Sequence, residues 1–162
     1  MSMTEATNQE QAPLFSIEKL YVKDLSLEVP HAPAIYLERV NPQIDLQLHS
    51  QAKQLEEGAF EVTITVTVTA SIPEQENKVM FLIEATQGGV FQIRNVPAEN
   101  IDPLLAVMCP NMLYPYLREV VSDASVRAGF APVLLNPVNF ESLYLQQKEQ
   151  QAQQEAASAT TH

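Results

Sequence analysis

One cysteine is the residue of this sequence with the clearest capacity for chemistry. Cys109 stands directly before Pro110, where the run CPNMLYPYLRE has the character of a helix. The dipole at a helix N-terminus could lower the pKa of a thiol there and make it nucleophilic. No residue that could serve as its base lies close in the sequence. The alternative, a small apolar residue near an interface, is therefore favoured over a reactive thiol.

The other polar candidates do not form a catalytic or metal site. His31 and His49 have no flanking cysteine or ligand spacing, and His162 is at the end of a tail expected to be disordered. Asp24 and Glu28 would be ~13 Å apart on a strand, too far to act as acid and base on one bond. We therefore predict no bound metal and no cofactor, and we expect a protein that is not an enzyme.

Two further motifs are better explained by structure than by ligand binding. Gly88-Gly89 lies within a strand pattern and does not match the glycine spacing of a phosphate-binding loop, so we predict a β-bulge there. Tyr114 and Tyr116, with Met112, could line a ligand pocket. At helical spacing, however, a role in the core or in an interface is favoured.

The composition indicates one domain in a reducing compartment. The chain has 162 residues and a net charge of -11 without a basic cluster, which argues against nucleic-acid binding. The polar N-terminus does not resemble a signal peptide, and no segment approaches the ~18 apolar residues of a membrane helix. One cysteine fits a reducing environment. We expect a cytoplasmic protein with a disordered segment 1–13, one domain over 14–146 and a flexible tail over 147–162.

Four strands are expected to precede any helix. Alternating side chains in AFEVTITVTVTAS predict a half-buried strand, and the turn-like IPEQEN leads into a returning strand that ends at VFQIRNV. QIDLQLHS is a further strand, as is the segment 14–29, in which Tyr21 should share the apolar face and Asp24 and Glu28 the opposite one. The proline-containing connection between these two strands is too long for a tight hairpin and predicts a crossover.

Helical signals follow the last strand. PAENIDPLLAVM predicts a short helix, and CPNMLYPYLREVVSDASVRA a longer one that restarts at Pro110, bends at Pro115 and stops at Gly129. Asn139 is expected to cap a last helix that frays after Gln146. Strands first and helices afterwards indicate an α+β fold with a four-stranded antiparallel sheet, a crossover connection and helices packed on one side.

The longer helix carries more apolar side chains than one sheet can bury. They point in several directions around the helix, so part of this surface is expected to contact another subunit. The residues predicted at this oligomer interface are Met112, Leu113, Tyr116, Leu117 and Val120.

Five stretches occur in a specific order between residue 14 and about residue 146. They are YVKDLSLEVPHAP, FEVTITVTVTA, FLIEATQGGVFQI, CPNMLYPYLRE and NPVNFESLY. In this combination they resemble the bacterial protein-export chaperone family SecB. The resemblance implies a SecB-like domain over 14–146 and a tetramer assembled as a dimer of dimers, with the long helices between the sheets.

The resemblance also implies a function. Members look like ATP-independent chaperones that bind unfolded precursor proteins in the cytosol, keep them competent for translocation and deliver them to the motor ATPase SecA. Such a protein needs an exposed apolar groove, because an unfolded chain differs from a folded one mainly by its uncovered hydrophobic segments. The side chains expected to line this client-binding groove are Tyr36, Leu37, Ile44, Leu46, Leu48, Phe140, Leu143 and Tyr144.

The contact with the motor is implied on an acidic surface of the sheet. The matching positions are Asp24, Glu28, Leu82 and Glu84, and each pair shares one face of its strand. An acidic patch would bind a basic surface with salt-sensitive affinity. In the family the tail makes an additional contact with the zinc-bearing end of the motor, but the Gln- and Ala-rich residues 147–162 do not align with it. That zinc would belong to the partner.

Three other functions stay open from the sequence. A SecB-like chaperone of a toxin-antitoxin pair would share the fold and could not be separated from an export chaperone. A small-molecule enzyme would depend on Cys109 as its nucleophile. A purely structural oligomer would assemble without binding any unfolded polypeptide.

Overall fold

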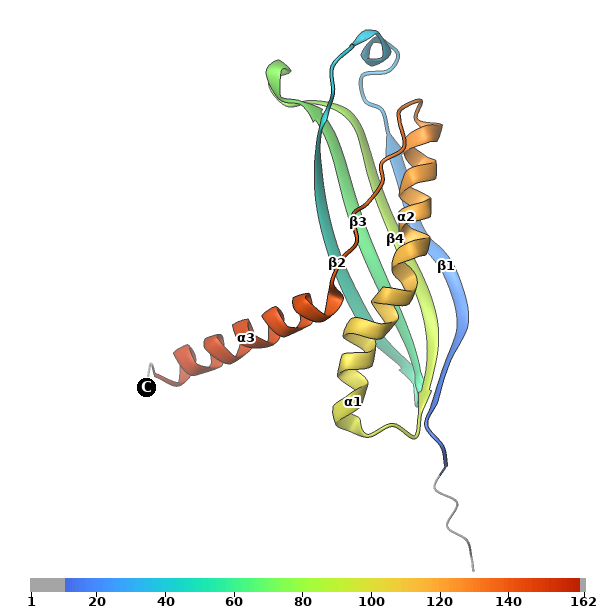
Figure 1. Cartoon of the computed structure of the whole chain (residues 1–162), viewed down its shortest axis with the longest axis vertical. Helices are drawn as coiled ribbons and strands as arrows, with labels where there is room; N and C mark the ends of the chain where they lie inside the picture. Colours follow the sequence, from blue (N-terminus) through green and yellow to red (C-terminus); the bar gives the residue numbers. More distant parts are fainter. Residues whose placement is uncertain (1–10, 161–162) are drawn as a thin grey trace, which may run out of the picture.

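A four-stranded sheet with a helical layer on one face forms the body of the chain (Figure 1). The structure is a computed structural model and describes residues 11–160. Its elements are β1 Leu14–Glu28, η1 Ala34–Leu37, β2 Gln43–Glu56, β3 Ala59–Ile72, η2 Pro73–Gln75, β4 Lys78–Arg94, α1 Ala98–Pro103, η3 Leu104–Met108, α2 Cys109–Arg127 and α3 Phe140–Ala159. η1 and η2 are short 3₁₀ segments, and η3 is a π-helical turn.

The strand order places the first two strands at opposite edges of the sheet. The order is β1-β4-β3-β2, and every neighbouring pair is antiparallel. The β2–β3 and β3–β4 connections are short, whereas the connection from β1 to β2 passes from one edge to the other (Figure 1). The predicted crossover and the predicted hairpin between β3 and β4 are therefore confirmed.

The glycine pair does not interrupt β4, which corrects the predicted bulge. The register shifts closest to the glycines lie instead in the pairing of β1 with β4, on the β1 side at residues 17–19 and 22–24. The glycines are needed for packing: a Cβ on Gly88 would lie 2.6 Å from the ring of Tyr21, and one on Gly89 would lie 2.9 Å from Leu113. The two positions thus admit a side chain from each face of the sheet.

The shifts in β1 also change which side chains share a face. Tyr21 pairs with Gly88 and Asp24 with Thr86, two residues apart on β4, so Tyr21 and Asp24 point to the same side. Strict alternation had placed them on opposite sides. The prediction was wrong because a register shift reverses the parity of every residue beyond it.

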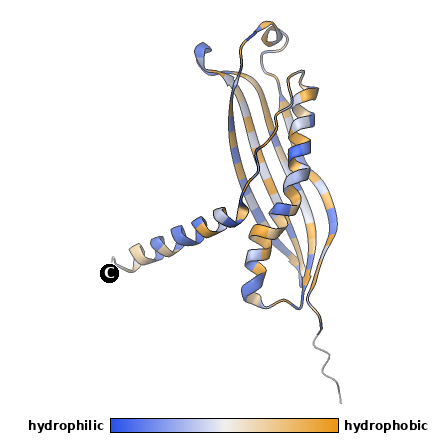
Figure 2. Ribbon diagram, viewed as in Figure 1, coloured by the Kyte–Doolittle hydropathy of each residue, from blue (hydrophilic) through white to orange (hydrophobic). Residues whose placement is uncertain are grey.

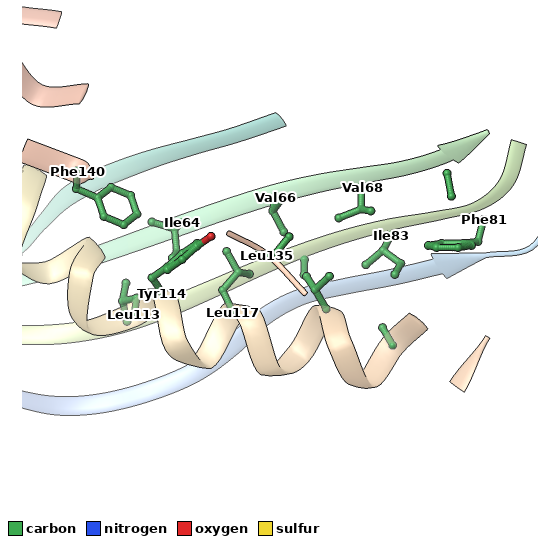
Figure 3. Packing of buried hydrophobic residues seen from close by; sticks show 14 of the residues in the cluster. Ile64, Val66, Val68, Phe81, Ile83, Leu113, Tyr114, Leu117, Leu135 and Phe140 are labelled. Atoms are coloured by element: carbon green, nitrogen blue, oxygen red, sulfur yellow. The ribbon is translucent and has the colours of Figure 1, made fainter. Parts of the chain in front are cut away.

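The core lies between β3, β4 and α2. The side chains of β3 alternate between buried aliphatic residues and threonines, of which Thr63 is buried and Thr65, Thr67 and Thr69 are partly exposed, as predicted for a half-buried strand. Leu113, Leu117 and Val121 of α2 pack onto this apolar face with Leu135 from the segment after the helix (Figure 3). No helix covers the opposite, threonine-bearing face in the described chain (Figure 1).

The helical run after the sheet is continuous from Ala98 to Arg127. The π-helical turn η3 joins α1 to α2, so the longer helix does not restart at Pro110 as predicted. A proline at this position tolerates the wider π turn before it, because the N–H that an α-helical bond would use is missing. Pro115 lies within α2, and the bend expected there stays a prediction.

Gly129 ends α2 as predicted. Its φ of +89° is in the left-handed region, its N–H donates to the Val126 carbonyl at 2.9 Å, and the Phe130 N–H donates to the Ser125 carbonyl at 3.1 Å. These two bonds form a Schellman motif, which satisfies carbonyls at the end of the helix. The chain then reverses direction towards α3.

The last helix projects away from the body of the protein (Figure 1). Asn139 caps it as predicted, since its Oδ1 accepts the Ser142 N–H at 3.0 Å. α3 continues to Ala159, further than the fraying expected after Gln146, because Ala, Gln and Glu favour helix. We predicted that the helices pack together on one side of the sheet. α3 is largely hydrophilic (Figure 2) and does not pack on the sheet beside α2, so for this helix the prediction was wrong. None of the described helices is long and apolar enough to cross a membrane.

Candidate functional site

An open hollow lies between the crossover connection and the segment that follows α2. We call it the crossover hollow; it has a volume of about 810 Å³. Its apolar lining consists of Ile35, Tyr36, Val40, Pro42, Ile44, Leu46, Met80, Phe81, Phe130, Ala131, Pro132, Val133 and Leu134. Because β2 is an edge strand, the hollow opens beside unpaired backbone groups.

Stacked aromatic rings hold one wall of the crossover hollow in place. Tyr36 stacks on Phe130 with ring centroids 5.4 Å apart, and Phe130 stacks on Phe81 at 4.9 Å. The Tyr36 hydroxyl donates to the Ala128 carbonyl at 2.8 Å. Tyr36 is nevertheless 47% exposed, so a preformed aromatic surface faces solvent.

A second hollow lies further along β2, where α3 begins. We call it the α3 hollow; it has a volume of about 290 Å³ and is lined by Leu48, His49, Ser50, Ala106, Phe140, Leu143, Tyr144, Gln146, Gln147 and Gln150. The Tyr144 hydroxyl donates to Asp102 Oδ2 at 2.9 Å, and Lys148 Nζ lies 3.8 Å from the same oxygen. These contacts connect α3 to α1.

The residues predicted for client binding divide between these hollows. Tyr36, Ile44 and Leu46 line the crossover hollow, and Leu48, Phe140, Leu143 and Tyr144 line the α3 hollow. Leu37 lines neither, although it is 84% exposed. Phe140 is 4% exposed and packs edge-on against Tyr114, so it belongs mainly to the core, which corrects its place among the exposed groove residues.

Sequence reasoning missed the wall that lies opposite β2. Phe130, Pro132 and Leu134 form it, and Leu134 is 73% exposed. A signal was present, since FAPVLLNPV is an apolar run that its prolines keep out of helix and out of the interior of a sheet. Such a run usually either completes the core or borders a binding surface, and here it does both.

The four residues predicted for the motor contact come together on the uncovered face of the sheet. Glu28 pairs with Leu82 across β1 and β4, and Glu84 lies two residues further along β4, opposite Ser26. Asp24 follows on the same side of β1. The three carboxylates are exposed, and Leu82 is partly exposed. The structure therefore places an acidic patch on the side away from α2.

A cross-sheet contact lies next to the acidic patch. The ring of Tyr21 lies over Gly88, and its hydroxyl reaches across β4 to donate to Glu61 Oε2 on β3. Lys23 Nζ lies 2.7 Å from Glu61 Oε1. The hydrogen bond from Lys23, followed by that from Tyr21, lowers the pKa of Glu61, whereas burial and then the bond to Glu61 raise the pKa of Tyr21 to about 12.

The predicted oligomer interface needs a correction. Leu113 and Leu117 are fully buried in the core of the chain itself and are not available to another subunit. Tyr116 is 49% exposed, and Met112 and Val120 are partly buried. Further exposed apolar residues lie on β1, the strand for which an apolar face was predicted: Leu14, Ile17, Val22, Leu25 and Leu27 are all at least 36% exposed.

Cys109 lacks the surroundings of a reactive thiol. It is fully buried inside the continuous helical run, and burial raises the pKa of its thiol to about 12. His31 and His49 are exposed, whereas His162 lies outside the described residues. Within residues 11–160 no group of three or more His, Cys, Asp or Glu side chains is arranged to hold a metal ion.

Comparison with known proteins is consistent with this arrangement. A family described as "SecB: Preprotein translocase subunit SecB" matches residues 8–151. A protein of Methylobacillus flagellatus, named Protein-export protein SecB, is 58% identical over 162 residues, and the match covers 100% of this chain and 100% of that protein. A protein of the same name from Chromobacterium violaceum is 61% identical over 145 residues, which cover 90% of this chain and 95% of that protein.

One solved structure shows the same fold at low sequence identity. It is a Mycobacterium tuberculosis SecB-like chaperone in complex with a ChAD peptide from an antitoxin, with a TM-score of 0.62 and 20% identity. The match covers 77% of this chain and 91% of that one. At this identity the likeness concerns the arrangement of the sheet and helices.

Proposed function

The chain belongs to the SecB family of preprotein translocase subunits, and from this membership we propose that it binds unfolded precursors without ATP and delivers them to SecA. It is a protein-export chaperone and not an enzyme. Binding to unfolded precursors requires open apolar surface, and delivery requires a second surface that stays free while the first is occupied.

The observation that carries this proposal is the pair of hollows along β2. Ile44 and Leu46 are 38% and 44% exposed, and they point to the same side of the strand as Leu48 at the α3 hollow. A large apolar side chain of a client that becomes fully buried there contributes about 1.5–3 kcal/mol to the free energy of binding. Several such contacts along one extended client add up, because each contact raises the effective concentration for the next.

The acidic patch on the opposite face supports separate binding of the motor. Asp24, Glu28 and Glu84 are exposed there, in a chain with a net charge of -11. A basic surface of SecA would associate with this patch at a rate that falls with added salt. Because the hollows lie on the helix-bearing side, a client and SecA can occupy the protein together. We place this encounter in the cytoplasm.

The apolar surface of β1 and α2 supports assembly into a tetramer built as a dimer of dimers. β1 is an edge strand with unpaired backbone groups and exposed Val22 and Leu25. Tyr116 and Val126 of α2 are about as exposed as the β1 residues. A second chain that packs on β1 would form a dimer and cover the first surface. A second dimer that packs on α2 would complete the tetramer and cover the other surface. Residues 147–162 are a candidate for a second contact with SecA, in addition to the acidic patch.

A refolding assay without ATP tests the function. The wild-type chain should delay refolding of a slow-folding precursor at stoichiometric tetramer, and Leu46→Glu should shorten the delay because it puts a charge in the crossover hollow. Leu55→Glu is the matched control, since Leu55 is on the same strand, is 49% exposed and lines neither hollow. Equal effects of both substitutions would show that the hollow is misplaced, and no delay by wild type would refute the proposal.

A toxin-antitoxin role is the weaker alternative. The M. tuberculosis SecB-like chaperone bound to an antitoxin peptide shares 20% identity with this chain, whereas the export proteins share up to 61%. Identification of the polypeptides that co-purify with the chain would separate the two roles. Secretory precursors are expected among them.

A further inference from the structure

The segment that forms the outer wall of the crossover hollow has almost no backbone support of its own. Residues 131–138, which we call the strap, run extended between α2 and α3 beside the sheet (Figure 1). In the described chain no backbone–backbone hydrogen bond involves these residues. Pro132 and Pro137 have no N–H to offer. The position of the strap must therefore come from side chains.

Ser125 supplies one of these contacts from inside α2. Its side chain is fully buried, and its Oγ accepts the Val133 N–H at 2.9 Å. The same hydroxyl donates within the helix, with the Ser122 carbonyl at 2.8 Å and the Val121 carbonyl at 3.1 Å. A hydroxyl has one hydrogen and two lone pairs, so it can bond in both directions at once. An alanine at this position would leave the Val133 N–H without its acceptor.

The contact to Val133 decides which strap residues face the hollow. Leu135 is buried at 3% exposure and Val133 packs partly against the core at the edge of the hollow, whereas Leu134 between them is 73% exposed and lines the crossover hollow. In extended chain a slip by one residue exchanges the two sides. Holding the N–H of Val133 thus keeps Leu134 pointed at the hollow.

The other contacts of the strap lie at its two ends. Before it, Phe130 is held by its bond to the Ser125 carbonyl and by stacking on Phe81. Towards its end, the Tyr114 hydroxyl donates to the Asn136 carbonyl. Between these points, Ser125 Oγ is the hydrogen-bonding side chain that contacts residues 131–135 in the described structure.

We propose that Ser125 is a positioning residue for client binding, which fixes the strap at the distance from β2 that the crossover hollow requires. This role rests on the proposed chaperone function, because it assigns to a buried helix residue the geometry of the client-binding wall. Ser125 itself does not contact the client. It acts through Val133 and Leu134.

Three variants and two measurements test this role. Ser125→Ala removes the acceptor, Ser125→Thr keeps a hydroxyl, and Ser122→Ala removes a partly exposed hydroxyl one turn earlier in α2. In Ser125→Ala we expect amide hydrogen exchange to rise about tenfold at Val133 and its neighbours but not in the sheet, and client release to be about fivefold faster. Ser125→Thr should restore both values towards wild type. Ser122→Ala should leave both unchanged.

The opposite results would overturn the proposal. Client release unchanged in Ser125→Ala, exchange that rises equally throughout the sheet, or the same effects from Ser122→Ala would each show that Ser125 has only a general structural role. If Ser125→Ala does not fold, hydrogen exchange in the wild type tests the contact itself. The Val133 amide must then exchange more slowly than the Leu134 amide, and equal exchange rates would overturn the proposal. A wild-type chain that binds no client would refute the chaperone function, while the Val133 amide would still report on the hydroxyl.

Discussion

Glu61 of β3 is connected to β1, across the intervening β4, through two side chains. It accepts the Tyr21 hydroxyl and the Lys23 ammonium, both from β1, while β4 lies between β1 and β3. The contact depends on a carboxylate that is ionised, because a protonated acid would lose the charge attraction to Lys23. Stability that comes from this contact should therefore vary with pH in a definite direction.

We predict that Glu61→Gln lowers stability at neutral pH and loses this effect in acid. The pKa of Glu61 in the folded chain is lowered from its ordinary 4.5, so its contribution is present above that value and disappears as the pH falls through the folded-state pKa. The loss at neutral pH should be at most about 1 kcal/mol, as for other accessible ion pairs. Urea unfolding of wild type and variant at neutral pH and at about pH 3 measures it.

Glu57→Gln is the control for this experiment, since Glu57 is an exposed carboxylate in the turn between β2 and β3. It should change stability little at either pH. A difference between wild type and Glu61→Gln that grows as the pH falls would contradict the assigned contact.

Charge reversal in the acidic patch should separate motor binding from client binding. Asp24→Lys or Glu84→Lys is expected to weaken SecA binding about tenfold or more at low salt, because each exchanges an attraction for a repulsion. Client binding should stay unchanged, since the hollows lie on the other face. Binding of SecA and of an unfolded precursor would be measured on the same preparations.

Glu57→Lys is again a matched control, because it makes the same charge change away from the patch. If the two patch variants weakened client and SecA binding equally, the two surfaces would not be separate.

At this scale the sequence indicates residue types better than positions. Asp24, Glu28, Leu82 and Glu84 were found by alternation together with family resemblance, and the sheet brings them to one face. Tyr21 was assigned to the wrong face because register shifts leave no mark in the hydrophobic pattern. The bond from the Val133 N–H to Ser125 Oγ could not be foreseen for another reason, since a sequence does not show which backbone N–H is bonded by a side chain.

The two glycines of β4 show how a missing side chain can position an element. With no Cβ at Gly88, the ring of Tyr21 can pass over β4 and reach β3. This contact fixes the edge strand β1 to the middle of the sheet in addition to its backbone ladder. It also lies beside the register shift that turns Asp24 outward.

We predict that Gly88→Ala destabilises the chain through its clash with Tyr21. The new Cβ would lie 2.6 Å from Cε2 of the ring, which must move and give up Glu61. The expected cost is about 1–3 kcal/mol, typical of overpacking. In a Tyr21→Ala background the same change should cost clearly less, because the ring is gone. Urea unfolding of the four proteins of this double-mutant cycle gives the coupling, and equal costs in both backgrounds would exclude the clash as the cause.

Most elements follow from local pattern, and their packing does not. The four strands, the glycine end of α2 and the Asn139 cap are each determined by a few neighbouring residues, so they could be predicted. The continuous helical run through η3 could not be predicted. The same sequence around Pro110 is compatible with a new helix that starts there and with a helix that continues through a π turn. α3 contacts the distant Asp102 through Tyr144 and Lys148, and local pattern does not reveal such contacts.

The whole molecule has more apolar surface than a single chain can cover. β1 and the outer side of α2 carry exposed apolar side chains that are not part of either hollow. Helical periodicity alone had assigned Leu113 and Leu117 to the interface, because it cannot tell which side of a helix meets its own sheet. The interface prediction is thereby moved to Tyr116 and to β1.

Substitutions at these two surfaces should lower the mass of the assembly in solution. We predict that Leu25→Glu and Tyr116→Glu each favour smaller species, since a charge buried at an apolar interface costs several kcal/mol. Leu134→Glu should leave the mass unchanged, although Leu134 is 73% exposed, because it faces the crossover hollow. Light scattering on the three variants and wild type tests this, and an unchanged mass in both interface variants would place the subunit contact elsewhere.

The positions of the two hollows along β2 set the length that one client segment needs to occupy both of them. From Ile44 to Ser50 an extended chain spans about 20 Å, so about seven stretched residues reach from one hollow to the other. A helix rises about 1.5 Å per residue and would need about thirteen residues for the same span. We therefore expect client segments that stay extended to reach both hollows with fewer residues than segments that have become helical.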